Sequence, residues 1–298
     1  ADTAEHVREC AARTVHDVPE KAVGRMFGKW YRDERAVRLV PCLAEVSHGP
    51  PDGDMIGGIC LSDIVAPQQD VSLAQYIQAT HALHNEKERR RTHLVFALGG
   101  TRTKFLDIGS AQMDKFLAAY ALTTEKRYLS ECYSEKAMAH VDVDLELPSE
   151  AATPGHLLDL EKMLMAAVQR AAGPVRVFAT GSTNRSCLQR GKMGWHIKAA
   201  IELDVPGLYA FAREVIIATY NSTYDWNTAI DLAPYEHRGL RMFGSRKVTK
   251  KEDLGGEYVL RGGLAANGEY LSPQQLLNEF RNDPIALLRS LSVLVSGS

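Results

Sequence analysis

The stretch HVDVDLEL, residues 140–147, alternates apolar and acidic residues for eight positions before Pro148. Successive side chains of a strand point to opposite faces, so Asp142, Asp144 and Glu146 would share one face while the valines and leucines pack behind them. The pattern predicts a half-exposed strand with carboxylates held side by side. Such carboxylates repel each other, and the arrangement becomes favourable when a divalent cation lies between them.

Oxygen donors without a thiolate favour a hard cation, so the expected ion is Mg²⁺ or Mn²⁺. The D-x-D pattern by itself is weak evidence, because a second copy, Asp52-Gly53-Asp54, lies in a segment rich in Pro and Gly and indicates a turn. A solvated sheet edge is the alternative interpretation of Asp142 and Asp144. The segments that follow them in the chain favour the metal site.

The residues after this strand predict an α+β fold. Helical periodicity covers 157–172, PVRVFATGS at 174–182 and WHIKAAIEL at 195–203 are typical of strands, and 207–220 is again helical. This order predicts a mixed sheet with helices on one face, with Trp195 in the core. The remaining predictions are helices at about 5–38, 71–91, 112–122 and 274–291, a buried strand at 94–100, and a glycine-rich hairpin before the last helix.

A glycine-rich basic loop, GSTNRSCLQRGKMGWHIK at 181–198, precedes and enters the second of these strands. Glycines let a backbone approach phosphate oxygens, and arginine and lysine neutralise them, so the loop is predicted to cradle a triphosphate. It is neither a Walker A motif nor a dinucleotide-binding fingerprint. For His196, a satisfied core histidine is the alternative. The cations of the loop are Arg185, Arg190, Lys192 and Lys198.

A third segment places Asp231 after an apolar residue and then gathers basic residues within seventeen positions. An acid followed by cations suits a metal ligand followed by phosphate contacts. These basic residues are His237, Arg238, Arg241, Arg246 and Lys247.

Composition limits the classes of function. Lys and Arg number 35 against 37 Asp and Glu, a net charge of −2, so no global positive field attracts nucleic acid and any polyanion must meet local clusters. No apolar run approaches the length of a spanning helix, and the first residues lack a signal peptide, so no membrane association is expected. Five cysteines without a C-x-x-C pair indicate reduced thiols in an intracellular compartment.

Two weaker features have ordinary explanations. The basic run NEKERRRTH, 85–93, could line a template groove, but such a run is more often a solvated helix end. Zinc is not expected, because one candidate set has no cysteine nearby and the other has irregular spacing. Those candidates are His81, His84 and His93, and separately Cys42, His48 and Cys60.

The three segments VDVDLEL, RGKMGWH and AID occur in the order and spacing that resemble the archaeo-eukaryotic primase superfamily. GSTNR, GWHI and IDLAPYEHRGLRMFGSRK are similar to the primase part of poxvirus-type and other large-DNA-virus primase-helicases. The resemblance covers about residues 133–250. Gly194 departs from the Ser that many relatives carry there, which puts a hydroxyl contact to phosphate in doubt.

The resemblance implies an archaeo-eukaryotic primase fold, with an RRM-like mixed sheet as its catalytic core and a flanking helical N-terminal part. It implies one primase domain over 1–298, with an N-terminal α/β part at 1–130, the core at 131–250 and a C-terminal helical part at 251–298. Asp142, Asp144 and Asp231 would hold two divalent ions, Mg²⁺ or Mn²⁺. The implied nucleotide-binding residues are Ser182, Arg185, Arg190, Lys192, His196, Arg241 and Lys247, the last two on phosphate or template.

The implied function is a DNA-template-directed primase or primase-polymerase that makes short primers from NTPs or dNTPs on single-stranded DNA, for viral DNA replication in the host cell. The chain has no initiating Met, and we expect a fragment of a longer primase-helicase with an attached or partner helicase of superfamily-three type. Two alternatives remain. One is a catalytically inactive single-strand-binding module that loads a helicase, and the other is an unrelated metal-dependent nucleotidyltransferase or nuclease.

Overall fold

The computed structural model describes ten stretches of the chain: 58–68, 71–80, 83–84, 91–95, 104–147, 153–182, 192–219, 224–237, 239–248 and 253–295. The predicted helix at 5–38, the turn that holds Asp52 and Asp54, and most of the basic run at 85–93 lie outside these ranges.

The described residues form two antiparallel sheets, which confirms the α+β class. The predicted mixed sheet is wrong, because each strand pair in both sheets is antiparallel. The five-stranded sheet has the order β1 (Leu83–His84), β3 (Lys104–Leu106), β2 (His93–Val95), β4 (Leu129–Cys132), β9 (Gly239–Arg241). The other has the order β10 (Arg246–Val248), β11 (Asp253–Leu264), β6 (Val177–Ser182), β7 (Lys192–Asp204), β5 (Lys136–Glu146), β8 (Ile230–Asp231), and β12 (Tyr270–Leu271) pairs with β11.

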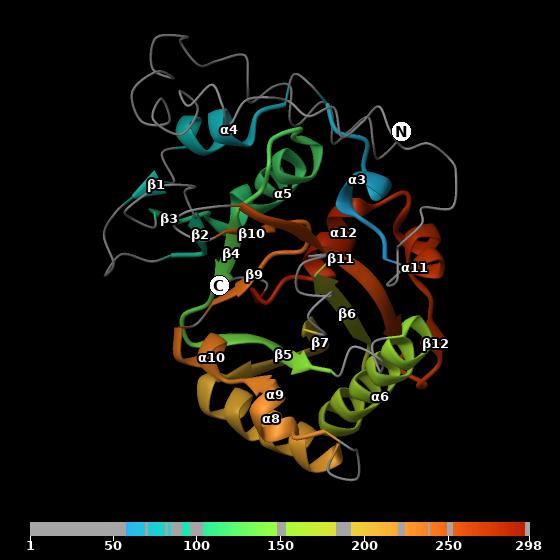
Figure 1. Cartoon of the computed structure of the whole chain (residues 1–298). Coiled ribbons are helices and arrows are strands. Elements are labelled where there is room, and N and C mark those ends of the chain that lie inside the picture. Colours follow the sequence, from blue (N-terminus) through green and yellow to red (C-terminus); the bar gives the residue numbers. More distant parts are fainter. Residues whose placement is uncertain are drawn as a thin grey trace.

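The larger sheet is built around a split β-α-β arrangement. The chain runs β5, α6 (Pro154–Ala172), β6, β7, α8 (Val205–Ala218) and β8, and the strands lie in the order β6-β7-β5-β8. Helices α6 and α8 lie along the same face of the sheet (Figure 1). The predicted strands at 140–147, 174–182 and 195–203 and both predicted helices are therefore confirmed.

The α6 helix has clear boundaries in the sequence. The Thr153 side chain accepts a hydrogen bond from the His156 backbone at its start, where Pro154 fits the first turn. Gly173, with φ of 88°, follows its last residue and adopts a backbone conformation that favours glycine.

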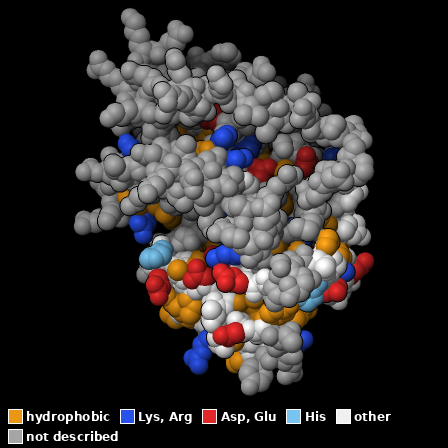
Figure 2. Space-filling model, in the orientation of Figure 1, with side chains coloured by type: hydrophobic (Ala, Val, Ile, Leu, Met, Phe, Trp, Pro, Cys, Tyr) orange, Lys and Arg blue, Asp and Glu red, His pale blue; other side chains and the backbone are white. Residues whose placement is uncertain are grey.

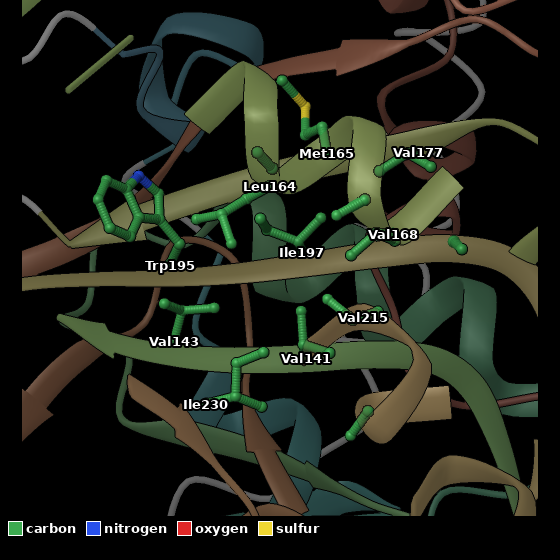
Figure 3. Close-up of a cluster of buried hydrophobic side chains, with 14 of the residues drawn as sticks. Val141, Val143, Leu164, Met165, Val168, Val177, Trp195, Ile197, Val215 and Ile230 are labelled. Atoms are coloured by element: carbon green, nitrogen blue, oxygen red, sulfur yellow. The ribbon is translucent and has the colours of Figure 1, made fainter. Parts of the chain in front are cut away.

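The apolar side chains of the alternating strands meet α6 and α8 in one core. Figure 3 shows Val141 and Val143 of β5 and Trp195 and Ile197 of β7 beside Leu164, Met165 and Val168 of α6. Each fully buried side chain of this size contributes about 1.5–3 kcal/mol to folding. Trp195 is in the core as predicted, and its indole nitrogen donates to the buried Glu161 carboxylate at 3.1 Å.

A second core lies between the opposite face of the larger sheet and the helices near the smaller sheet. Phe178 and Leu260 of the larger sheet belong to it. Its helices are α3 (Leu61–Ile64), α4 (Leu73–Ala79), α5 (Met113–Leu122), α11 (Pro273–Phe280) and α12 (Pro284–Ser290). The other short helices are η2 (Ser110–Gln112), α9 (Trp226–Ala229) and α10 (Ala233–His237).

Three sequence predictions differ from the structure. The helix predicted at 71–91 is confirmed at 73–79, whereas 83–84 form strand β1, and 81–82 and 85–90 lie outside the described ranges. The last helix is divided in two, because Asp283 caps a new helix whose first residue is Pro284. The predicted C-terminal helical part begins with β11, a long strand that pairs with β6 across the larger sheet.

The segment from Leu291 to Val293 joins the two sheets. The Val293 amide donates to the Glu131 carboxylate of β4 at 2.8 Å, and the Val293 carbonyl accepts from the Met138 amide of β5 at 2.9 Å. The Lys198 ammonium of β7 donates to the Leu291 carbonyl. Among the described residues, no helix is both long enough and apolar enough to cross a membrane.

Candidate active site

Strand pairing brings the three predicted acids together. Asp142 in the middle of β5 lies directly opposite Asp231 of β8 on one side and opposite His196 of β7 on the other. Directly opposed residues of antiparallel strands have Cα atoms about 4.5–5.5 Å apart and project to the same face. Asp144, two residues further along β5, shares that face and lies opposite Gly194.

Asp231 is held by the turn that follows it. Its Oδ1 accepts a hydrogen bond from the Ala233 amide at 2.8 Å, so the carboxylate is fixed where β8 ends and α10 begins. Asp142 and Asp231 are both half-buried. The Asp231 carboxylate is thus restrained before any ligand binds.

His196 is buried beside these acids. Its side chain is 3% exposed, and its Nε2 lies 3.5 Å from Asp142 Oδ1. Burial, followed by the nearby charges of Lys198 and Arg241, holds the pKa of this imidazole well below 6.5. The ring is therefore neutral near pH 7, and its contact with Asp142 is a polar contact of a neutral imidazole and not an ion pair.

Lys192 supplies a cation beside the acids. Its Nζ lies 3.1 Å from Asp144 Oδ2, and both side chains are more than one third exposed. The predicted phosphate-binding lysine is thus at the rim of the acidic face, where a ligand can reach it.

A side chain at Gly194 would crowd the Asp144 carboxylate. An ideal Cβ at this residue would lie 3.3 Å from Asp144 Oδ1 and 3.5 Å from the Tyr258 hydroxyl. The glycine thus lets the Asp144 carboxylate approach the β7 backbone closely. This close approach gives a physical reason for Gly194, where many archaeo-eukaryotic primases carry Ser.

The structure adds Tyr258, which the sequence analysis missed. The Tyr258 ring, from β11, stacks on the His196 ring with centroids 4.0 Å apart and an interplanar angle of 21°. Arg241, at the end of β9 in the smaller sheet, places its guanidinium carbon 4.9 Å from the centroid of the Tyr258 ring. The predicted phosphate or template contact at Arg241 therefore lies beside His196, although it comes from the other sheet.

The other predicted nucleotide-binding residues have mixed outcomes. Ser182 ends β6 opposite Tyr258 and is half-buried. Arg185 and Arg190 lie outside the described ranges, as does the side chain of Lys247, whose backbone is in β10. Lys198, grouped with the cations of the loop, is 2% exposed and bonded to the Leu291 carbonyl, so that assignment is wrong.

Acidic and basic side chains meet on the surface over this site. Figure 2 shows them next to each other near the middle of the face, in the region where Figure 1 places β5 and α10. This juxtaposition of charge suits a ligand that carries both phosphate groups and a bound cation.

The donor set of the site fits hard divalent cations. Asp142, Asp144 and Asp231 offer carboxylate oxygens on one face of two adjacent strands, and no thiol is among them. In the part of the chain that the structure describes, no group of three or more His, Cys, Asp or Glu side chains is already drawn together as a metal-binding cluster.

Comparison with known proteins does not assign the chain to a family, since no protein-family model and no curated protein matches it.

Proposed function

We propose that this chain is a template-directed nucleotidyltransferase of the primase type that joins NTPs or dNTPs into short primers on single-stranded DNA. The observation that carries the proposal is the position of Asp142, opposite Asp231 on one neighbouring strand and opposite His196 on the other, with Asp144 on the same face. Carboxylates and a phosphate-directed imidazole on one sheet face are the groups that phosphoryl transfer needs.

The fold supports the same proposal. The strand order β6-β7-β5-β8 with two helices on one face is the order of an RRM-like sheet, which the resemblance to archaeo-eukaryotic primases implies for the catalytic core. The acids lie on the face of the sheet opposite α6 and α8, at its β5–β8 end, where all three are only partly buried and a nucleotide can approach. The proposal includes the partners of that family, a single-stranded DNA template and an attached or separate helicase, at a site of viral DNA replication.

The reaction proposed is attack of a primer hydroxyl oxygen on the α-phosphorus of the incoming nucleotide. A new P–O bond forms, the bond between the α-phosphorus and its bridging oxygen breaks, and pyrophosphate leaves while the hydroxyl proton passes to solvent. Two divalent ions held by Asp142, Asp144 and Asp231 would supply activation of the hydroxyl and neutralisation of the leaving group.

The protein's own groups have separate tasks in this reaction. The neutral His196 imidazole donates an N–H to a phosphate oxygen, and the flexible Lys192 ammonium neutralises the triphosphate from the rim. Gly194 keeps the β7 backbone clear so that Asp144 holds its position beside the strand. Burial of His196 excludes water from one side of the site.

The test is primer synthesis on single-stranded DNA with Mn²⁺ and labelled NTPs or dNTPs. We expect oligomers from the wild-type chain and a loss of at least about 100-fold in the Asp142→Ala, Asp144→Ala double variant, since removal of an electrostatic contact to the transition state has this magnitude. The Asp114→Ala, Glu202→Ala double variant is the matched control, because it removes two exposed acids from ion pairs outside the site.

Three results would contradict the proposal. Equal primer synthesis by the two double variants would show that Asp142 and Asp144 take no part in the reaction. Binding of single strands without incorporation would favour the helicase-loading module, and addition without a template would favour an unrelated nucleotidyltransferase.

A further inference from the structure

Tyr258 packs directly against His196 and does not belong to the predicted motifs. The two rings are nearly parallel, 4.0 Å apart, and both residues are buried, with 5% and 2% of their surfaces exposed. Aromatic pairs prefer offset stacking at such distances, and the stack restricts rotation of the smaller ring.

Register explains how a residue of β11 reaches β7. Tyr258 lies opposite Ser182 and Leu260 opposite Thr180 on β6, and Thr180 in turn lies opposite His196. Two strand spacings, about 10 Å, separate β11 from β7. The small side chains of Thr180 and Ser182 leave space above β6, so the long tyrosine side chain extends across that strand to the imidazole.

The hydroxyl end of Tyr258 is also held. It lies 3.5 Å from the position that a Cβ of Gly194 would occupy, and Arg241 hydrogen-bonds to it while its guanidinium lies near the ring. Burial is the largest effect on the phenol and raises its pKa, so the group stays protonated near pH 7. A buried, neutral ring fixed at both ends is suited to hold another group in place.

We propose that Tyr258 is a positioning residue for His196: its ring fixes the plane of the imidazole and so sets the direction in which His196 presents its N–H to a phosphate oxygen. Rotation of the imidazole would require the Tyr258 ring to move, and Arg241 of the smaller sheet restrains that ring. The inference rests on the proposed function for the role of the phosphate, whereas the restraint on His196 is a property of the free protein.

The test compares Tyr258→Met with Tyr258→Phe in the metal-free protein and in the primer assay. Methionine fills much of the volume without a planar ring, and phenylalanine keeps the ring without the hydroxyl. We expect the ¹⁵N signals of His196, assigned with His196→Gln, to report one tautomer in the wild type and in Tyr258→Phe. In Tyr258→Met these signals should move toward the average of two tautomers. The KM for nucleotide should rise about five-fold, a change that corresponds to the energy of one aromatic pair, while kcat stays within about two-fold of the wild-type value.

A matched control is Tyr76→Met, which alters a buried tyrosine of α4 whose hydroxyl donates to the Gln112 carbonyl. It should lower the melting temperature without moving the His196 signals, and a Tyr258→Met variant that behaves in the same way would overturn the proposal. Equal effects of Tyr258→Phe and Tyr258→Met would also overturn it, since the ring would then not be the cause. If the wild type makes no primers, the nitrogen spectra still decide the positioning role.

Discussion

Lys192 and Asp144 form an ion pair of 3.1 Å between a cation at the rim of the site and one of its three acids. The strand register explains it, because Asp144 lies opposite Gly194, two residues from Lys192 on β7. In the ligand-free protein the lysine therefore compensates a charge that a divalent ion would otherwise neutralise. Binding of a triphosphate would give Lys192 another partner and leave Asp144 to the metal.

The Lys192→Met variant should bind free Mn²⁺ more tightly than the wild type, by about two- to five-fold, because exposed ion pairs contribute up to about 1 kcal/mol. The same variant should bind nucleotide more weakly, since one phosphate contact is lost. Electron paramagnetic resonance of free Mn²⁺ measures the first effect. Lys136→Met, which breaks the exposed pair with Glu202, is the control and should leave Mn²⁺ affinity unchanged. Unchanged affinity in both variants would show that Lys192 does not compete with the ion.

The Gly194→Ala variant should lose activity without losing the fold. Its Cβ would lie 3.3 Å from Asp144 Oδ1, so the carboxylate must move by a few tenths of an ångström. Small displacements of this kind in a catalytic site lower turnover by about ten-fold or more. Primer assays and thermal unfolding measure the two effects. Gly155→Ala, at a position in α6 with open space around it, should change neither greatly, and full activity in Gly194→Ala would contradict the close approach inferred for Asp144.

The Lys198→Met variant should lower the free energy of unfolding by about 3 kcal/mol, because it leaves the buried Glu131 without its cationic neighbour. Burial raises the pKa of Glu131 and lowers the pKa of Lys198, and each charge partly offsets the effect on the other. Urea denaturation measures the loss, and adding Glu131→Gln should recover part of it. The exposed Lys136→Met change should cost much less, because solvent screens the charge of its pair with Glu202. An equally small loss in Lys198→Met would rule out a structural role for the buried lysine.

His93 should make the stability of the protein depend on pH. Burial against Phe116 lowers its pKa from 6.5 to about 3, so the unfolded chain takes up a proton that the folded chain does not. This contribution to stability is complete above pH 6.5 and is lost as the pH falls toward 3. Between pH 6 and pH 4, His93→Leu should reduce the slope of unfolding free energy against pH by about 1 kcal/mol per pH unit. An identical slope in both proteins, measured by denaturant titration, would show that His93 does not control it.

The local pattern of apolar and polar residues was sufficient to predict the strands and helices around the site. The alternation in β5 and the periodicity of α6 and α8 follow from which face of each element is buried, and that information lies within a few residues. The proximity of Asp142 and Asp231 was an expectation from the resemblance to archaeo-eukaryotic primases, and the structure places the two residues opposite each other.

Features that depend on distant segments were not predictable in the same way. Alternation along β7 places Lys198 on the face of His196, but its burial depends on Leu291 and Glu131 from other parts of the chain. Tyr258 lies in a glycine-rich stretch that suggests a hairpin, and only the pairing of β11 with β6 brings it to the site. The break between α11 and α12 did have a local signal, Asp283 followed by Pro284.

The contacts of Leu291 and Val293 with β4, β5 and β7 also constrain the order of events during synthesis. Strands that appear early from the ribosome cannot bury Glu131 and Lys198 in their final surroundings until this late segment has emerged. Contacts between such distant parts of a chain form slowly. Until they form, both sheets expose surface that is buried in the folded protein, and the nascent chain is prone to aggregation. A stalled ribosome that still holds residues beyond 290 should therefore carry a protease-sensitive chain.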